Sequence, residues 1–160
     1  MLRNVSPDDA GSICTIYNYF IEHTAITFEE EILAPDQMRE RIVETTKSYP
    51  WFVCEVDGKL LGYAYGRKWR ERSAYRHSVE VTFYLDPSAV GKGIGTELLD
   101  ALLTELRKRE FHCVIGGVAL PNPASVALLE KFGLRQVAHF KEVGYKLGRW
   151  IDVGYWQIVF

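Results

Sequence analysis

The sequence contains few cysteines, and they are spread along the chain. Only three occur among 160 residues, at Cys14, Cys54 and Cys113. An odd number of widely separated cysteines provides neither a disulfide framework nor the short ligand spacing of a metal site. We therefore expect buried free thiols, no bound metal and the reducing environment of the cytoplasm.

The chain also lacks an excess of charge of one sign and a long apolar run. Nineteen basic and 21 acidic residues give a formal net charge of −2, so no global field attracts nucleic acid or an anionic membrane. No stretch reaches the roughly 20 apolar residues that a membrane-spanning helix needs. The first residues have no apolar core of a signal peptide. We expect neither nucleic acid nor a membrane among its partners.

What is present favours a single globular domain over residues 1–160. Hydrophobic residues make up 48% of the chain and aromatic residues 13%, enough for a substantial core at this length. Strands are predicted over 2–5, 51–56, 60–65, 77–85, 113–120, 135–143 and 152–160. Helices are predicted after the capping residues 6–9 and over 35–47, 95–109 and 124–132. Polar loops are predicted over 67–76 and 144–151. This order is typical of an α/β (α+β) protein with a mixed sheet of six to seven strands flanked by about four helices.

The most informative segment is a strand followed by a glycine-rich loop and a helix. The strand ends at Asp86-Pro87, because proline cannot donate to a sheet ladder. Three alternating glycines follow, at Gly91, Gly93 and Gly95. Free backbone N–H groups at the start of a helix bind phosphate well. The spacing completes neither the dinucleotide-binding fingerprint nor the P-loop. A phosphate site of another kind and a simple tight turn both remain open.

Several segments together resemble a known family. Residues 90–95 resemble the acetyl-CoA pyrophosphate loop of the GNAT superfamily of N-acetyltransferases, and residues 120–134 are similar to its second cofactor segment. The chain also resembles one branch of that superfamily, the phosphinothricin and methionine sulfoximine N-acetyltransferases, over residues 49–51, 71–76, 79–80 and 144–157. The resemblance covers nearly the whole chain. It implies the GNAT fold with a mostly antiparallel sheet, acetyl-CoA as co-substrate, and a homodimer with 150–160 as a candidate interface.

Glu80 is the candidate catalytic residue. It lies on the strand that leads to the glycine loop, and Val79 and Val81 should face the opposite side of the sheet. A cationic amine must lose a proton before it can attack a thioester, and a carboxylate is a suitable base. The alternative is a structural acid paired with an arginine. The resemblance favours the base, because the family's general-base glutamate matches Glu80.

The resemblance also implies which residues bind the cofactor and the acceptor. Backbone groups of the strand would hold the pantetheine arm and polarise the thioester carbonyl, and the glycine loop would hold the pyrophosphate. The implied cofactor residues are Phe83, Tyr84, Leu85, Gly91, Lys92, Gly93, Ile94, Gly95, Thr96, Asn122 and Lys131. The implied substrate residues are Arg70, Glu71, Arg72, Tyr75, Glu80, Val81 and Thr82. An arginine there suits the acid group of an amino acid. Phe28 and Trp51 are candidate pocket walls, and His77 and His139 are candidate proton carriers.

Two positions depart from the family pattern. Val90 stands where the superfamily usually has Gln or Arg, which implies weaker anchoring of the pyrophosphate. Leu129 stands where relatives carry Tyr or His, a candidate acid for the leaving thiolate, and leucine cannot donate a proton. We expect an N-acetyltransferase that acts on phosphinothricin, methionine sulfoximine or methionine sulfone. The alternatives are an N-acetyltransferase for a polyamine, an aminoglycoside or a protein N-terminus, and a non-catalytic acetyl-CoA-binding protein.

Overall fold

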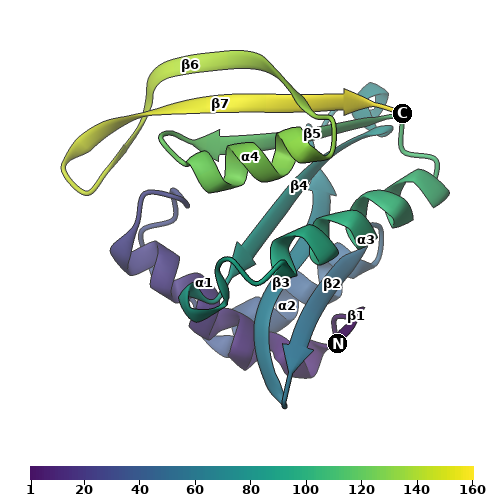
Figure 1. Ribbon diagram of the computed structural model, residues 1–160, viewed down its shortest axis with the longest axis vertical. Coiled ribbons are helices and arrows are strands. Elements are labelled where there is room, and N and C mark those ends of the chain that lie inside the picture. Colours follow the sequence, from purple (N-terminus) through teal and green to yellow (C-terminus); the bar gives the residue numbers. More distant parts are fainter.

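A seven-stranded sheet forms the centre of the molecule, with strand order β1-β2-β3-β4-β5-β7-β6. The computed structural model describes all residues from Met1 to Phe160 (Figure 1). The strands are β1 Leu2–Asn4, β2 Trp51–Val56, β3 Lys59–Lys68, β4 Ser78–Leu85, β5 Cys113–Ala119, β6 Arg135–Lys146 and β7 Arg149–Val159. The helices are α1 Ala10–His23, α2 Pro35–Thr46, α3 Ile94–Lys108 and α4 Pro123–Lys131.

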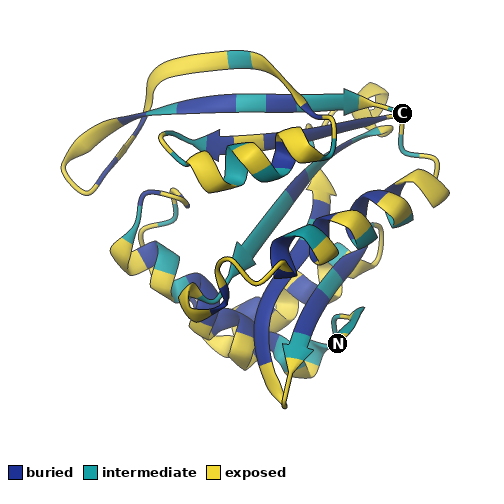
Figure 2. Ribbon diagram, viewed as in Figure 1, coloured by how far each residue is buried: buried dark blue, intermediate teal, exposed yellow.

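Two hydrophobic clusters cover the two faces of this sheet. One joins α3 and α4 to the strands, and the leucines that α3 presents at helical spacing are fully buried in it, at Leu98, Leu99, Leu102 and Leu106. The other joins α1 and α2 to β2 and β3 through Ile13, Ile42, Trp51 and Tyr63. Buried segments accordingly run through the middle of the strands (Figure 2). The sheet therefore separates an α3–α4 face from an α1–α2 face.

The strands β4 and β5 form the one parallel pair, and it is short. Only Ser78–Glu80 pairs with Cys113–Ile115, whereas β4 continues beside β3 as far as Leu85 and β5 continues beside β7 as far as Ala119. The two strands therefore diverge after Glu80 and Ile115 (Figure 1). The divergence leaves one backbone edge of each strand unpaired in the middle of the sheet.

Two predicted loops are wrong in their bounds. The loop over 67–76 begins later, because β3 extends to Lys68 and pairs Arg67 with Glu80. The loop over 144–151 is mostly strand, because β6 and β7 continue to a two-residue turn at Leu147-Gly148. Both turn residues have positive φ, 54° and 74°, which matches the turns that best fit the twist of a hairpin.

The expected fold, helix cap and buried thiols are confirmed. The fold is a mixed, mostly antiparallel sheet with four α-helices. Ser6 and Asp9 form the predicted capping box ahead of α1. All three cysteines are buried free thiols, and no group of side chains is arranged to hold a metal ion. None of the helices combines the length and apolar character needed to cross a membrane.

Candidate active site

A cavity of about 680 Å³ lies where β4 and β5 diverge. Its walls come from both faces of the sheet: the unpaired stretch of β4, the end of β5, the first half of α4, and the segment between α1 and α2. The residues that line it include Tyr17, Thr27, Phe28, Glu29, Arg41, Arg67, Glu80, Val81, Thr82, Phe83, Tyr84, Asn122, Ser125, Leu129 and Tyr155. The divergence of the strands thus creates an opening that connects the α1–α2 face with the α3–α4 face.

Glu80 faces this cavity from the last position of β4 that pairs with β5. Its side chain is 16% exposed, and its neighbours Val79 and Val81 are buried in the opposite cluster, as the alternation predicts. Arg67 Nη2 donates to Glu80 Oε1 over 2.6 Å. The pairing with an arginine that the sequence left open is therefore present, but at the cavity rather than on the outer surface.

A second ion pair lies on the α1–α2 side of the cavity. Two N–H groups of Arg41 donate to the two carboxylate oxygens of Glu29, over 2.9 and 2.6 Å. The hydroxyl of Tyr17 also donates to Glu29 and is 2.8 Å from the hydroxyl of Thr27. The hydrogen bond from Arg41 is the main reason that the pKa of Glu29 is lowered. Sequence reasoning missed this network, because its members are joined only by tertiary packing.

The segment between α1 and α2 is held in place by the β6–β7 hairpin. Lys146 is only 4% exposed, and its Nζ donates to the carbonyl oxygen of Thr27 over 2.8 Å. Burial lowers the pKa of this lysine. The ring of Phe28 lies on Gly144, where a Cβ atom would be 2.4 Å from the ring. These contacts fix Thr27 and Phe28 at the cavity wall.

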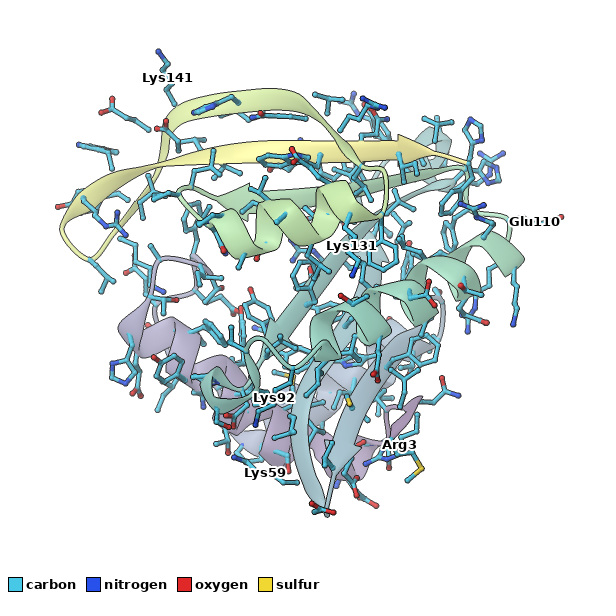
Figure 3. The ribbon with its side chains drawn as sticks, viewed as in Figure 1. Arg3, Lys59, Lys92, Glu110, Lys131 and Lys141 are labelled. Atoms are coloured by element: carbon cyan, nitrogen blue, oxygen red, sulfur yellow. The ribbon has the colours of Figure 1, made fainter.

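The glycine-rich loop lies at the start of α3, beside the end of α4. Gly91 and Gly93 have φ of 80° and 81°, a conformation that side chains disfavour, and the space around both is open. Lys131 Nζ is 3.4 Å from Thr96 Oγ1, so the end of α4 contacts the first turn of α3. Figure 3 labels Lys92 on the loop and Lys131 at the end of α4. The unpaired N–H groups of the first helical turn and these two lysines suit a phosphate group.

Asn122 stands at the entrance to α4. Its Oδ1 accepts a hydrogen bond from the backbone N–H of Ser125 over 3.2 Å, so it caps the helix. It also lines the cavity. Asn122 is therefore a capping residue that also borders the cavity, and its role as a cofactor ligand stays a prediction.

A family model of the acetyltransferase (GNAT) domain matches residues 2–154 of this chain. The chain belongs to the GNAT acetyltransferase family. It is 34% identical over 156 residues to the phosphinothricin N-acetyltransferase of Streptomyces viridochromogenes, covering 98% of this chain and 85% of that protein. It is 32% identical over 158 residues to the L-methionine sulfoximine/L-methionine sulfone acetyltransferase of Salmonella typhimurium, covering 98% and 92%.

A solved structure supports the same assignment. The crystal structure of a GNAT superfamily phosphinothricin acetyltransferase from Sinorhizobium meliloti, in complex with acetyl-CoA, matches with a TM-score of 0.96 at 34% identity, covering 99% of this chain and 87% of that one. GNAT acetyltransferases use acetyl-CoA, and the split sheet and glycine loop described above fit that molecule. The predicted family, fold and co-substrate are confirmed.

The interior of this GNAT acetyltransferase carries no proton donor at Leu129. The side chain is 1% exposed and packs on Gly116, where a Cβ atom would be 2.9 Å from Leu129 Cδ1. The hydroxyl-bearing side chains of Ser125 and Tyr155 line the same cavity. Other residues of the site can therefore donate a hydrogen bond where Leu129 cannot.

Several residues that the sequence analysis singled out lie outside the cavity of this GNAT chain. Arg70, Glu71, Arg72 and Tyr75 are exposed on the β3–β4 loop, and Leu85 packs against the core. His77 is exposed and His139 pairs with Asp152 at 2.7 Å. Trp51 stacks on Tyr65 with ring centroids 4.1 Å apart, so it belongs to the core. Of the candidate walls, only Phe28 lines the cavity.

Proposed function

We propose that this chain is an N-acetyltransferase that moves the acetyl group of acetyl-CoA to the α-amino group of a small amino-acid analogue. Phosphinothricin, methionine sulfoximine and methionine sulfone are the proposed acceptors, because relatives named for these compounds match nearly the full length of the chain. The observation that carries the proposal is the placement of Glu80. A largely buried carboxylate faces a cavity at the point where the sheet opens.

Glu80 is proposed to act as the general base. Acetyl-CoA supplies the acetyl group as a thioester. Glu80 accepts one proton from the acceptor ammonium, which frees the nitrogen lone pair for attack on the thioester carbonyl carbon. The C–N bond forms, the C–S bond breaks, and the second proton lost from nitrogen passes to the leaving sulfur. Backbone N–H groups on the unpaired edge of β4 are suited to stabilise the negative charge that develops on the carbonyl oxygen.

The cofactor residues proposed from the family pattern form a continuous path along the α3–α4 face. The backbone at Phe83, Tyr84 and Leu85 offers the unpaired edge of β4 to the pantetheine arm. The loop and first turn from Gly91 to Thr96, including Lys92 and Ile94, are proposed to hold the pyrophosphate with Lys131. Ile94 is buried in the core, so its contribution is through the backbone. Asn122 is proposed to bond the arm at the other side of the split.

The acceptor is proposed to bind on the α1–α2 face. Glu80 and Thr82 line the cavity there with Phe28, and Val81, whose side chain packs in the cluster with α3 and α4, borders the cavity between them. The roles of Arg70, Glu71, Arg72 and Tyr75 stay a proposal from the family pattern, because these side chains lie on the loop outside the cavity of one chain.

We also propose a single-domain protein that forms a homodimer in the cytoplasm. Trp150 is exposed, but most of β7 is buried or half-buried in the sheet, which leaves β6 as the better candidate surface. Its exposed apolar residues are Val137, Phe140, Val143 and Tyr145. Sedimentation at assay concentration tests the dimer.

The proposed cytoplasmic location rests on the cysteines. The scattered free cysteines suit a reducing compartment.

Measurement of CoA thiol release from acetyl-CoA tests the proposed function. Parallel reactions contain phosphinothricin, methionine sulfoximine, methionine sulfone, spermidine or a lysine peptide. Release with the amino-acid analogues supports the proposal, and release only with spermidine or the peptide changes the acceptor class. Acetyl-CoA binding without release by any amine would favour a non-catalytic binding protein, the alternative that Leu129 supports.

A further inference from the structure

Two arginines line the cavity, and they differ in how their guanidinium groups are already engaged. Arg41 uses both terminal nitrogens of its guanidinium on Glu29. Arg67 makes one side-chain hydrogen bond, from Nη2 to Glu80, and its side chain is 53% exposed. A guanidinium carries five N–H donors in a fork that matches a carboxylate. Arg67 therefore retains free donors at the cavity, whereas the fork of Arg41 is already engaged.

Glu80, beside Arg67, has a carboxylate oxygen that is free to accept a hydrogen bond. Arg67 contacts its Oε1 at 2.6 Å, and Oε2 has no hydrogen-bond partner within the chain. A carboxylate with a free acceptor oxygen and a guanidinium with free N–H donors thus lie side by side at the edge of the cavity. The other carboxylate of the cavity, Glu29, accepts hydrogen bonds from Arg41 and Tyr17 on its two oxygens.

We propose that Arg67 binds the acid group of the acceptor while Glu80 receives its amine, so that a zwitterion inserts into the Arg67–Glu80 ion pair. The inference rests on the proposed function and names the residue that makes the acceptor an amino acid rather than a plain amine. In an α-amino acid the ammonium and the carboxylate are separated by one carbon atom. The carboxylate of such a ligand pairs with Arg67 and its ammonium pairs with Glu80, so two ion pairs replace the one between Arg67 and Glu80.

Under this proposal the acid group is bound by Arg67 on strand β3 rather than by the arginines of the β3–β4 loop. Arg70 and Arg72, the arginines that the family pattern offers, lie outside the cavity on the exposed β3–β4 loop. Arg67 lies on β3 directly across from Glu80 in the β3–β4 register. Its distance from Glu80 is therefore fixed by sheet geometry rather than by loop conformation.

A matched pair of acceptors separates recognition by Arg67 from its effect on Glu80. Methionine sulfone and its α-amide differ only in the carboxylate, and both are assayed with the wild-type protein and with Arg67→Gln. For the wild type, kcat/KM is expected to favour the acid. Arg67→Gln is expected to lower kcat/KM for the acid about 10- to 100-fold and to change that for the amide less than about threefold, as expected for loss of a charged hydrogen bond. Arg39→Gln, which removes an arginine paired with Asp8 outside the cavity, serves as the control.

Two results would overturn the inference while leaving the proposed function intact. Equal kcat/KM for acid and amide in the wild type would show that the carboxylate is not recognised. An equal loss for both acceptors in Arg67→Gln would show that the arginine acts only through Glu80. If the wild type turns over neither acceptor, methionine sulfone fails as a proposed substrate, and calorimetric titration of the acid and the amide still tests the inference. The inference is supported if the wild type binds the acid more tightly than the amide and Arg67→Gln does not. Equal affinities of the wild type for the two ligands contradict it.

Discussion

At the scale of single residues, the chemistry depends on whether Glu80 is a base or only a partner of Arg67. We expect Glu80→Gln to lower kcat at least about 100-fold, because glutamine cannot accept the ammonium proton. The affinity for acetyl-CoA should stay unchanged, since the amide keeps the size of the side chain and the proposed cofactor contacts lie elsewhere. Steady-state kinetics and a direct binding titration measure the two effects. Glu44→Gln, on the exposed side of α2, is the matched control, and an unchanged kcat in Glu80→Gln would assign Glu80 a structural role.

The residues of the candidate site differ in how well sequence could predict them. Glu80, the glycine loop and Asn122 belong to short contiguous motifs, so local pattern was enough to find them. Arg67 was placed in a polar loop, because nothing in the sequence shows that β3 continues along β4 to Lys68. Glu29 and Arg41 meet only through the packing of the segment between α1 and α2. Residues brought together by register or packing leave no local signal.

At the scale of elements, the β6–β7 hairpin determines the shape of the acceptor side through Gly144. An added methyl group there would be 2.4 Å from the ring of Phe28, so Gly144→Ala must displace the ring from the cavity wall. We expect the KM for the amine to rise several-fold and the KM for acetyl-CoA to stay the same. Lys141→Ala, which trims an exposed side chain on the same strand, should change neither value. A rise in both KM values of Gly144→Ala would indicate general damage to the sheet instead.

A second element-scale prediction concerns the start of the chain, where Arg3 links β1 to the turn before α1. Arg3 donates to both oxygens of Asp9, over 2.8 and 2.9 Å. These bonds are the main reason that the pKa of Asp9 lies below its usual 3.8, and the Ser6 N–H adds to the effect. A lowered folded-state pKa means that this stabilisation is present above the unfolded-state value and is lost as the pH falls through the folded-state value.

Asp9→Asn is therefore expected to lower the free energy of unfolding by about 2 kcal/mol at pH 7. The difference from wild type should shrink as the pH falls below about 4, where the wild-type carboxylate becomes protonated. Urea denaturation at several pH values measures both quantities. Asp100→Asn, at an exposed position of α3, is expected to change stability by less than about 0.5 kcal/mol. A difference between wild type and Asp9→Asn that does not vary with pH would assign the loss to the turn rather than to the charge.

At the scale of the whole molecule, the sheet consists of two parts joined by a narrow seam. Three residue pairs connect β4 to β5, whereas the neighbouring pairings of β3 with β4 and of β5 with β7 extend over seven pairs each. The first part carries α1 and α2, and the second carries β6, β7 and α4. Sequence could predict the strands and their order of appearance, but the early end of the β4–β5 pairing has no local signal, because the two strands are far apart in the sequence and meet only in the assembled sheet. The opening is thus a property of the assembled sheet.

Occupation of the opening by acetyl-CoA should therefore stabilise the molecule across its seam. We expect saturating acetyl-CoA, at about 100 times its Kd, to add about 2.7 kcal/mol to the free energy of unfolding by mass action. Hydrogen exchange should slow most at the edges that the strands leave unpaired, residues 81–85 of β4 and 116–119 of β5. Strand β1, at the edge of the sheet and separated from β4 by β2 and β3, is the internal control. Slowing that is uniform over all strands would mean that acetyl-CoA stabilises the fold without bridging β4 and β5. Slowing confined to the glycine loop would mean that only the phosphate groups of acetyl-CoA contact this protein.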